Sequence, residues 1–269
     1  MPGEQIRGTT IHYEQSGAGP NLLFVHGMCG DAQVWDTQVG LLRDRFACTT
    51  YDRRGHSRSL RGDAAESDAT HADDAAALIE ALGLEPVVVV ASSGGARISV
   101  ELLRRRPDIV AGAVLSEPPL LSLDPEAARG FLDELVPRVE QALEQDGPPG
   151  AVDAFFAFVC PGLWSRIDEQ VKDRYRANAS AMLAELSAPP NRVAPDDLAG
   201  VRTPALVLRG TDSHPALRRV AAVVAGALPQ ARAVELADCG HVTYAEQPER
   251  FAAEVAAFAH ETLTPATRA

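Results

Sequence analysis

Basic residues and long apolar runs are both scarce in this chain, and each shortage excludes a class of partner. Lys and Arg number 25 against 37 Asp and Glu, which gives a formal net charge of -12 at pH 7. A surface with this acidic excess repels nucleic acids and anionic membranes, so we expect neither as a partner. No apolar run approaches the roughly 20 residues that cross a bilayer, and Met1–Gln5 lacks the basic and apolar regions of a secretory signal. These features predict a cytoplasmic protein that acts on a small-molecule substrate.

Metal-binding and cofactor-binding patterns are missing as well. The cysteines have the spacing of neither a zinc site nor a redox pair, and we expect reduced, partly buried thiols at Cys29, Cys48, Cys160 and Cys239. No glycine-rich phosphate loop follows the first buried strand. We therefore expect no cofactor and no metal, and the sequence leaves open whether the chain forms a homodimer.

The chain does have an alternation of strand and helix patterns. Its 269 residues, 46% of them hydrophobic, are enough for one large core. Apolar residues with a period of two or in short runs predict strands at 10–15, 21–25, 46–51, 87–90, 110–116, 205–209 and 231–236. Helical spacing predicts helices at 31–44, 70–82, 96–106 and 246–262. This alternation favours an α/β fold with a mostly parallel sheet covered on both faces.

The strand pattern stops between residues 119 and 199. Helices are predicted there at 124–146, 151–159 and 163–186, with a break at Gly147-Pro148-Pro149-Gly150. We predict a core domain made of 1–118 and 200–269, and a helical insertion at 119–199. The aromatic residues of the insertion are expected mainly to pack against one another, with some lining an apolar pocket: Phe155, Phe156, Phe158 and Trp164.

One strand ends in a pattern typical of a nucleophile elbow. Val87–Val90 is followed by Ala91-Ser92-Ser93-Gly94-Gly95 and then by a helical pattern. An elbow needs small residues two positions before and after its nucleophile. Ser93 meets this condition with Ala91 and Gly95, whereas Ser92 would place Val90 in the crowded position. We therefore predict Ser93 as the nucleophile.

Three further elements occur in the order found in one family: His26-Gly27-Met28, Tyr51-Asp52-Arg53-Arg54-Gly55-His56-Ser57 and Gly240-His241. With the elbow, they resemble the α/β-hydrolase family over nearly the whole chain. The resemblance implies an eight-stranded, mostly parallel sheet with a helical cap inserted after strand six. It also implies an oxyanion hole formed by the backbone amides of Met28 and Gly94, and a structural turn at residues 53–56.

A serine hydroxyl needs a base, and the resemblance points to His241, which comes last in chain order. Two carboxylates could orient that imidazole. Asp212 follows the seventh strand, the commoner location, but one residue earlier than the family spacing, where Ser213 stands. Glu117 ends the sixth strand, in a Ser-Glu-x-Pro form. This form, with Tyr13-Glu14-Gln15 and Ser92-Ser93-Gly94, is similar to fungal lactonases that open the macrolactone zearalenone. We favour Glu117 slightly over Asp212.

The predicted activity is a serine hydrolase that cleaves a carboxylic ester or lactone of a small-to-medium, partly apolar substrate. Two alternatives use the same residues: a carbon–carbon bond hydrolase of diketones, and a cofactor-free perhydrolase or haloperoxidase-like enzyme. A third is a ligand-binding, receptor-like protein. The complete set of Ser93, His241 and a carboxylate favours an enzyme.

Overall fold

A single sheet forms the centre of the protein, seen here in a computed structural model whose described residues are 3–65, 67–188 and 192–263. Its eight strands have the order β1-β2-β4-β3-β5-β6-β7-β8. The β1–β2 and β2–β4 pairs are antiparallel, and all pairs from β4 through β8 are parallel. The predicted α/β architecture, with a mostly parallel eight-stranded sheet, is confirmed.

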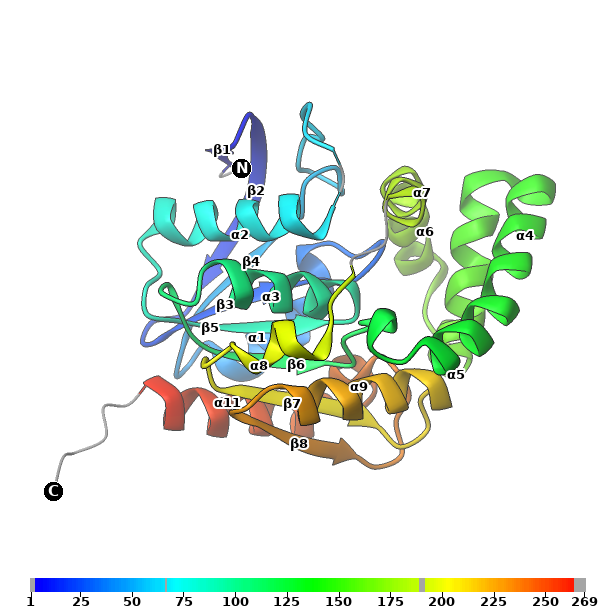
Figure 1. Ribbon diagram of the computed structural model, residues 1–269. Helices are drawn as coiled ribbons and strands as arrows, with labels where there is room; N and C mark the ends of the chain where they lie inside the picture. Colours follow the sequence, from blue (N-terminus) through cyan, green and yellow to red (C-terminus); the bar gives the residue numbers. More distant parts are fainter. Residues whose placement is uncertain (1–2, 66, 189–191, 264–269) are drawn as a thin grey trace, which may run out of the picture.

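The strands are β1 Gly3–Ile6, β2 Thr9–Ser16, β3 Asn21–Val25, β4 Ala47–Tyr51, β5 Val87–Ser92, β6 Val110–Ser116, β7 Ala205–Gly210 and β8 Ala231–Leu236. Before β6 come the helices η1 Ala32–Trp35, α1 Asp36–Leu42, α2 Asp68–Leu82 and α3 Gly94–Arg105. Helix α8 Pro195–Ala199 precedes β7, and α9 Pro215–Ala227, α10 Thr243–Glu246 and α11 Pro248–Leu263 come after β7. Helices α2 and α3 pack together on one face of the sheet, and α1 and α11 pack together on the other (Figure 1).

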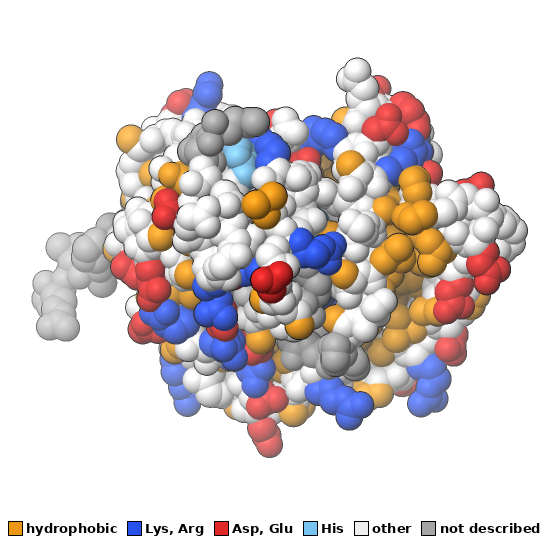
Figure 2. All heavy atoms as spheres, turned by 90° about the horizontal axis from the view of Figure 1, so that it is seen from above, with side chains coloured by type: hydrophobic (Ala, Val, Ile, Leu, Met, Phe, Trp, Pro, Cys, Tyr) orange, Lys and Arg blue, Asp and Glu red, His pale blue; other side chains and the backbone are white. Residues whose placement is uncertain are grey.

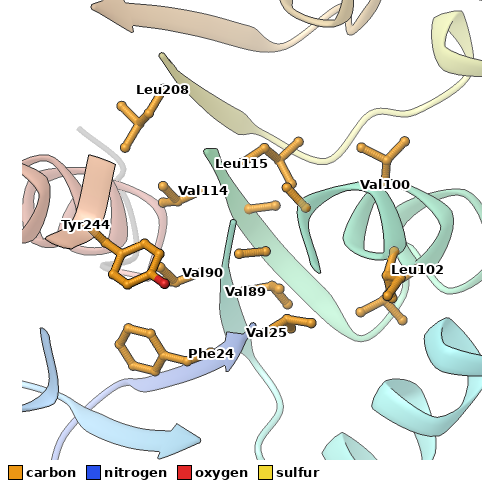
Figure 3. Packing of buried hydrophobic residues seen from close by; sticks show 14 of the residues in the cluster. Phe24, Val25, Val89, Val90, Val100, Leu102, Val114, Leu115, Leu208 and Tyr244 are labelled. Atoms are coloured by element: carbon orange, nitrogen blue, oxygen red, sulfur yellow. The ribbon is translucent and has the colours of Figure 1, made fainter. Parts of the chain in front are cut away.

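Alternating side chains of the central strands fill both faces of the sheet. Val25, Val89 and Leu115 point toward α3, where Val100 and Leu102 meet them, as Figure 3 shows. Phe24, Val90, Val114 and Leu208 point to the opposite side, toward Tyr244. All of the strand residues in this set are fully buried. The continuous apolar run of β5 is therefore explained by burial on both faces, as expected of a parallel sheet.

A helical cap is inserted after strand β6, as the sequence predicted. It begins after η2 Leu121–Leu123 and contains α4 Pro125–Val159, α5 Pro161–Trp164, α6 Glu169–Ala177 and α7 Ala179–Ser187. Helix α4 is interrupted at Gly147, where φ is 71° and ψ is -166°. This is the break that the Gly-Pro-Pro-Gly pattern indicated, because only glycine adopts such angles readily. Figure 1 shows the cap helices over the carboxyl ends of the strands.

Some predicted elements differ from the structure. The helix predicted at 163–186 is divided into α5, α6 and α7, because Asp168 and Asn178 leave the helical conformation. The short edge strand β1 and helix α9 were not predicted. The predicted limits of the cap at 119 and 199 stay predictions, and residues 189–191 and 264–269 lie outside the described residues. No helix in the described part of the chain is long and apolar enough to cross a membrane.

Candidate active site

Ser93 lies at the sharp turn between β5 and α3. Its φ of 53° and ψ of -125° are unusual for a residue with a side chain. The Ser93 amide donates to the carbonyl of Ser116 on the neighbouring strand β6, at 2.8 Å. Gly95 makes the turn possible, because a Cβ there would lie 2.3 Å from the Val25 carbonyl oxygen. The strained turn lifts the Ser93 hydroxyl away from the sheet, as expected of an elbow.

The structure joins Ser93, His241 and Glu117 by two hydrogen bonds. His241 Nε2 lies 2.9 Å from Ser93 Oγ, and His241 Nδ1 lies 2.6 Å from Glu117 Oε2. His241 follows β8, whereas Glu117 directly follows β6, so the three residues come from the carboxyl ends of three strands. His241 and Glu117 are both buried. An ionised carboxylate at Nδ1 holds the imidazole so that Nε2 faces the hydroxyl as an acceptor.

The carboxylate of Glu117 is fixed by two more donors. The Gly210 amide donates to Oε1 at 2.9 Å, and the Ser213 hydroxyl donates to Oε2 at 2.5 Å. Glu117 has a φ of 47°, so its backbone turns sharply out of β6. Sequence reasoning did not assign a role to Gly210 or Ser213. The position of Ser213 could have indicated a role beside the imidazole, because Ser213 stands where the family spacing has its acid.

Asp212 does not meet His241. Its side chain is exposed and accepts a hydrogen bond from the Thr211 hydroxyl at 3.0 Å. Its amide donates to the Cys239 carbonyl. The one-residue offset noted in the sequence therefore turns Asp212 outward and Ser213 inward, toward Glu117. Of the two carboxylates left open by the sequence, Glu117 is the one that contacts the imidazole.

The amides of Met28 and Gly94 lie beside the Ser93 turn. A Cβ built on Gly94 would lie 3.5 Å from the Met28 nitrogen, and one on Gly27 would lie 3.1 Å from Ser93 Cβ. Residues 26–30, which we call the oxyanion loop after the role predicted for the Met28 amide, therefore lie against the elbow. The loop turns at Cys29, whose φ is 56°, and is closed by a hydrogen bond from the Gly30 amide to the Gly27 carbonyl.

His26 braces this loop as a neutral imidazole. Its Nε2 accepts from the Arg53 amide at 2.9 Å, which leaves Nδ1 to donate to the Gly27 carbonyl at 2.8 Å. Burial, together with the nearby Arg53 guanidinium, holds the pKa of His26 well below its usual value. Arg54, also in the 53–56 turn, forms a buried ion pair with Asp74. Both arginines of this turn therefore make structural contacts, in agreement with the structural role predicted for the turn.

Two cavities flank Ser93 and His241. The larger, about 550 Å³ with its open part included, is mainly apolar and is lined by cap residues such as Phe131, Leu135, Phe155 and Val159. The smaller, about 390 Å³ measured in the same way, is lined by the oxyanion loop, Phe156, Tyr175 and Tyr244.

Apolar side chains gather along the cap helices on the right of Figure 2. Leu132 and Leu186, which line the larger cavity, are 39% and 47% exposed. The cap thus supplies an apolar wall beside the reactive serine.

The aromatic residues of the cap divide between these walls and the packing of the cap itself. Phe155 and Phe156 line cavities, while Trp164 stacks on Phe156 with ring centroids 4.7 Å apart. Phe158 packs on Phe131.

All four cysteines are free and buried, and burial raises the pKa of the Cys29 thiol well above its usual value.

Comparisons with known proteins find hydrolases and related enzymes. An uncharacterized hydrolase, YraK, of Bacillus subtilis (strain 168) is 38% identical over 137 residues, which are 49% of this chain and 51% of that protein. The chain thus matches only about half the length of YraK. A non-heme haloperoxidase of Rhodococcus erythropolis is 29% identical over 218 residues, or 77% of this chain and 80% of the other.

An esterase of Thermogutta terrifontis, solved with malate bound, has the same fold. The TM-score is 0.80 at 24% identity, over 98% of this chain and 100% of that one. A family model described as the alpha/beta hydrolase family matches residues 22–254, which include Ser93, Glu117 and His241. The chain therefore belongs to the alpha/beta hydrolase family.

Proposed function

We propose that this protein is a serine hydrolase that cleaves a carboxylic ester or lactone through an acyl-enzyme. The observation that carries the proposal is the hydrogen-bond chain from Ser93 Oγ through His241 to Glu117. A serine hydroxyl is a poor nucleophile until a base accepts its proton. The 2.9 Å between His241 Nε2 and Ser93 Oγ supports His241 as that base.

The reaction proceeds in two halves. Ser93 Oγ attacks the substrate carbonyl carbon while its proton passes to His241 Nε2, and the carbonyl oxygen becomes an oxyanion that accepts from the Met28 and Gly94 amides. The tetrahedral intermediate then breaks its bond to the alcohol oxygen, which takes the proton from His241. In the second half, water attacks the acyl carbon while His241 Nε2 takes its proton. The second tetrahedral intermediate breaks its bond to Ser93 Oγ, which takes that proton back from His241, and the acid is released.

Glu117 serves this cycle by orientation and charge. It accepts from His241 Nδ1 and stabilises the imidazolium that forms when Nε2 is protonated. The Gly210 amide and the Ser213 hydroxyl donate to this carboxylate and hold it in place through both halves of the reaction. The cap cavity, with its apolar lining, favours a substrate whose larger part is a hydrocarbon chain or ring.

A fluorophosphonate probe tests the nucleophile directly, because it phosphonylates only an activated serine. We expect labelling of the wild-type protein and none of Ser93→Ala, with Ser92→Ala labelled as a matched control. Labelling that persists in Ser93→Ala, or none in the wild type, would contradict the proposal.

A substrate panel tests the bond that is cleaved. It contains alkyl esters, simple lactones, a zearalenone-type macrolactone and vinylogous diketones. Turnover of esters or lactones supports the proposal. Turnover of diketones alone would replace it with the carbon–carbon hydrolase alternative, which uses the same serine and histidine.

The haloperoxidase relative supports one second candidate, cofactor-free perhydrolysis. Here hydrogen peroxide replaces water in the second half of the reaction and releases a peracid from the acyl-enzyme. Peracid formation from acetate and peroxide, lost in Ser93→Ala, would demonstrate it. Ester hydrolysis without peracid formation would contradict this second candidate.

A further inference from the structure

A residue of the cap contacts the backbone of the oxyanion loop directly. Asn178 lies between α6 and α7 and is 2% exposed. Its Nδ2 donates to the carbonyls of Cys29 and Gly30, both at 3.0 Å, and its Oδ1 accepts from the Ser57 amide at 2.7 Å. One side chain therefore satisfies three backbone groups of two core loops that are far from it in sequence.

A second cap residue reaches the same loop through an arginine. Glu185 on α7 accepts from Arg53 Nη2 at 2.7 Å, and the same Nη2 lies 3.2 Å from the Gly27 carbonyl oxygen. The Gly27 carbonyl and the Met28 N–H belong to one planar peptide unit. A cation that holds the carbonyl thus fixes the direction of the N–H on the opposite side, and it polarises that N–H as a donor.

The Arg53–Glu185 pair is costly as a purely structural feature. Both side chains are buried, at 0% and 4% exposed. Within the described residues, Arg53 Nε and Nη1 and Glu185 Oε2 have no hydrogen-bond partner. Two further side chains lie close to the Glu185 carboxylate, His56 at 3.4 Å and Arg97 at 3.6 Å. The buried side chains of His26, Cys29 and His71 also interact with its charge. A buried ion pair with unsatisfied atoms adds little stability compared with an apolar pair. Stability alone therefore does not explain why Arg53 and Glu185 are paired at this place.

We propose that Asn178 and Glu185 are positioning residues through which the cap sets the Met28 N–H of the oxyanion hole. The inference rests on the proposed function for the meaning of that N–H. In this proposal the α6–α7 segment helps to position a catalytic donor, in addition to any role in covering the substrate. Helix movement that separated Asn178 from the loop would release Cys29 and Gly30 and misplace the donor.

The test compares Asn178→Ala with Arg174→Ala. Arg174 lies on α6 and also joins the cap to the core, but through the side chain of Asp31 at 3.2 Å and not through the loop carbonyls. We expect kcat for an ester substrate to fall about ten-fold or more in Asn178→Ala with KM changed by less than about two-fold, since small displacements of catalytic groups are costly. Arg174→Ala should keep kcat within about two-fold.

A second readout needs no activity. Cys29 is 1% exposed and is the residue at which the loop turns, so release of the loop exposes its thiol. We expect a maleimide to label Cys29, identified by peptide mass spectrometry, about ten-fold faster in Asn178→Ala than in the wild type or Arg174→Ala. Melting temperatures confirm that each variant is folded. If Asn178→Ala does not fold, Glu185→Gln, which keeps the volume and removes the charge, is judged by the same two readouts.

The outcomes separate the two proposals. Unchanged kcat and unchanged Cys29 labelling in a folded variant would overturn the positioning role while Ser93 chemistry stands. A wild type that lacks fluorophosphonate labelling would overturn the proposed function, and Cys29 labelling would still report whether Asn178 holds the loop. Equal losses of kcat in Asn178→Ala and Arg174→Ala would indicate general loosening of the cap and would also overturn the inference.

Discussion

The Ser213 hydroxyl donates to the same Glu117 oxygen that accepts from His241. The two distances to Oε2 are 2.5 Å and 2.6 Å. Ser213 therefore supports the acid from the position that an acid would otherwise occupy after β7. This arrangement separates the roles of residues 117, 212 and 213, and substitutions can measure each.

Glu117→Gln should abolish most of the activity. The amide cannot stabilise an imidazolium and favours the wrong tautomer of His241, so we expect kcat to fall about 10³- to 10⁴-fold. Asp212→Asn removes the other carboxylate considered in the sequence and should leave kcat within about two-fold. Steady-state kinetics on one ester measures both. The reverse result would assign the orienting role to Asp212.

Ser213→Ala should reduce kcat by about ten-fold with little change in KM, because a charge-assisted hydrogen bond to Glu117 is lost. Thr211→Ala is the matched control, since Thr211 lies in the same loop and its hydroxyl contacts Asp212 and the Asp238 amide. Equal kinetics for the two variants would show that the hydroxyl of Ser213 does not support the acid.

Gly95→Ala should prevent stable folding. The new methyl carbon would lie 2.3 Å from the Val25 carbonyl oxygen and 2.5 Å from that of His26, and neither backbone group can move freely. We expect a loss of about 3 kcal/mol or more in unfolding free energy. Gly40→Ala, in α1 with open space around it, should gain about 0.5–1 kcal/mol. Urea denaturation compares them, and equal stability would contradict the close contact at Gly95.

The protein should lose stability as the pH falls below about 6.5. Burial and the Arg53 charge lower the pKa of both His26 and His56 from 6.5, so the unfolded chain binds protons there before the folded protein does. Linkage then predicts that stability decreases between pH 6 and pH 5, with at most about 1.4 kcal/mol per pH unit from each histidine. Below about 4.5 a further loss follows, because the pKa of Glu185 is also lowered in the folded state, by the Arg53 charge against the opposing effect of burial.

His56→Gln isolates one of these contributions. The variant keeps a side chain that can accept from Arg53 and donate to the Arg54 carbonyl, but it does not titrate. Urea denaturation at a series of pH values should give a smaller slope between pH 6 and pH 5 than the wild type has. An unchanged slope would place the proton uptake elsewhere.

The pairing of Ser93 with His241 was predictable because each signal is local. Small residues around Ser93 mark the elbow, and the Gly-His pair near the end of the chain marks the base. The carboxylate was less predictable, since it depends on how β6 and β7 lie side by side. The Glu117 amide donates to the Leu208 carbonyl, and this contact brings the side chain of Glu117 to Ser213. Sequence spacing does not encode that register.

The cap contacts could not be predicted from sequence patterns. Asn178 meets Cys29 across 149 positions, and Glu185 meets Arg53 across 132. Neither residue stands in a recognisable motif. Helix boundaries in the cap depend on the same contacts, which explains why one predicted helix became three. The four-residue strand β1 is too short to give a reliable alternation of apolar and polar residues.

The bend of α4 at Gly147 has a consequence for enzyme engineering. The half of the helix before the bend supplies Phe131 and Leu135 to the larger cavity, and the half after it supplies Phe155 and Val159. The angle between the halves therefore affects the width of this cavity, which we propose receives the substrate. Variants that differ only at residues 147–149 would therefore change the size of substrate that is accepted, while the sequence around Ser93, Glu117 and His241 stays unaltered.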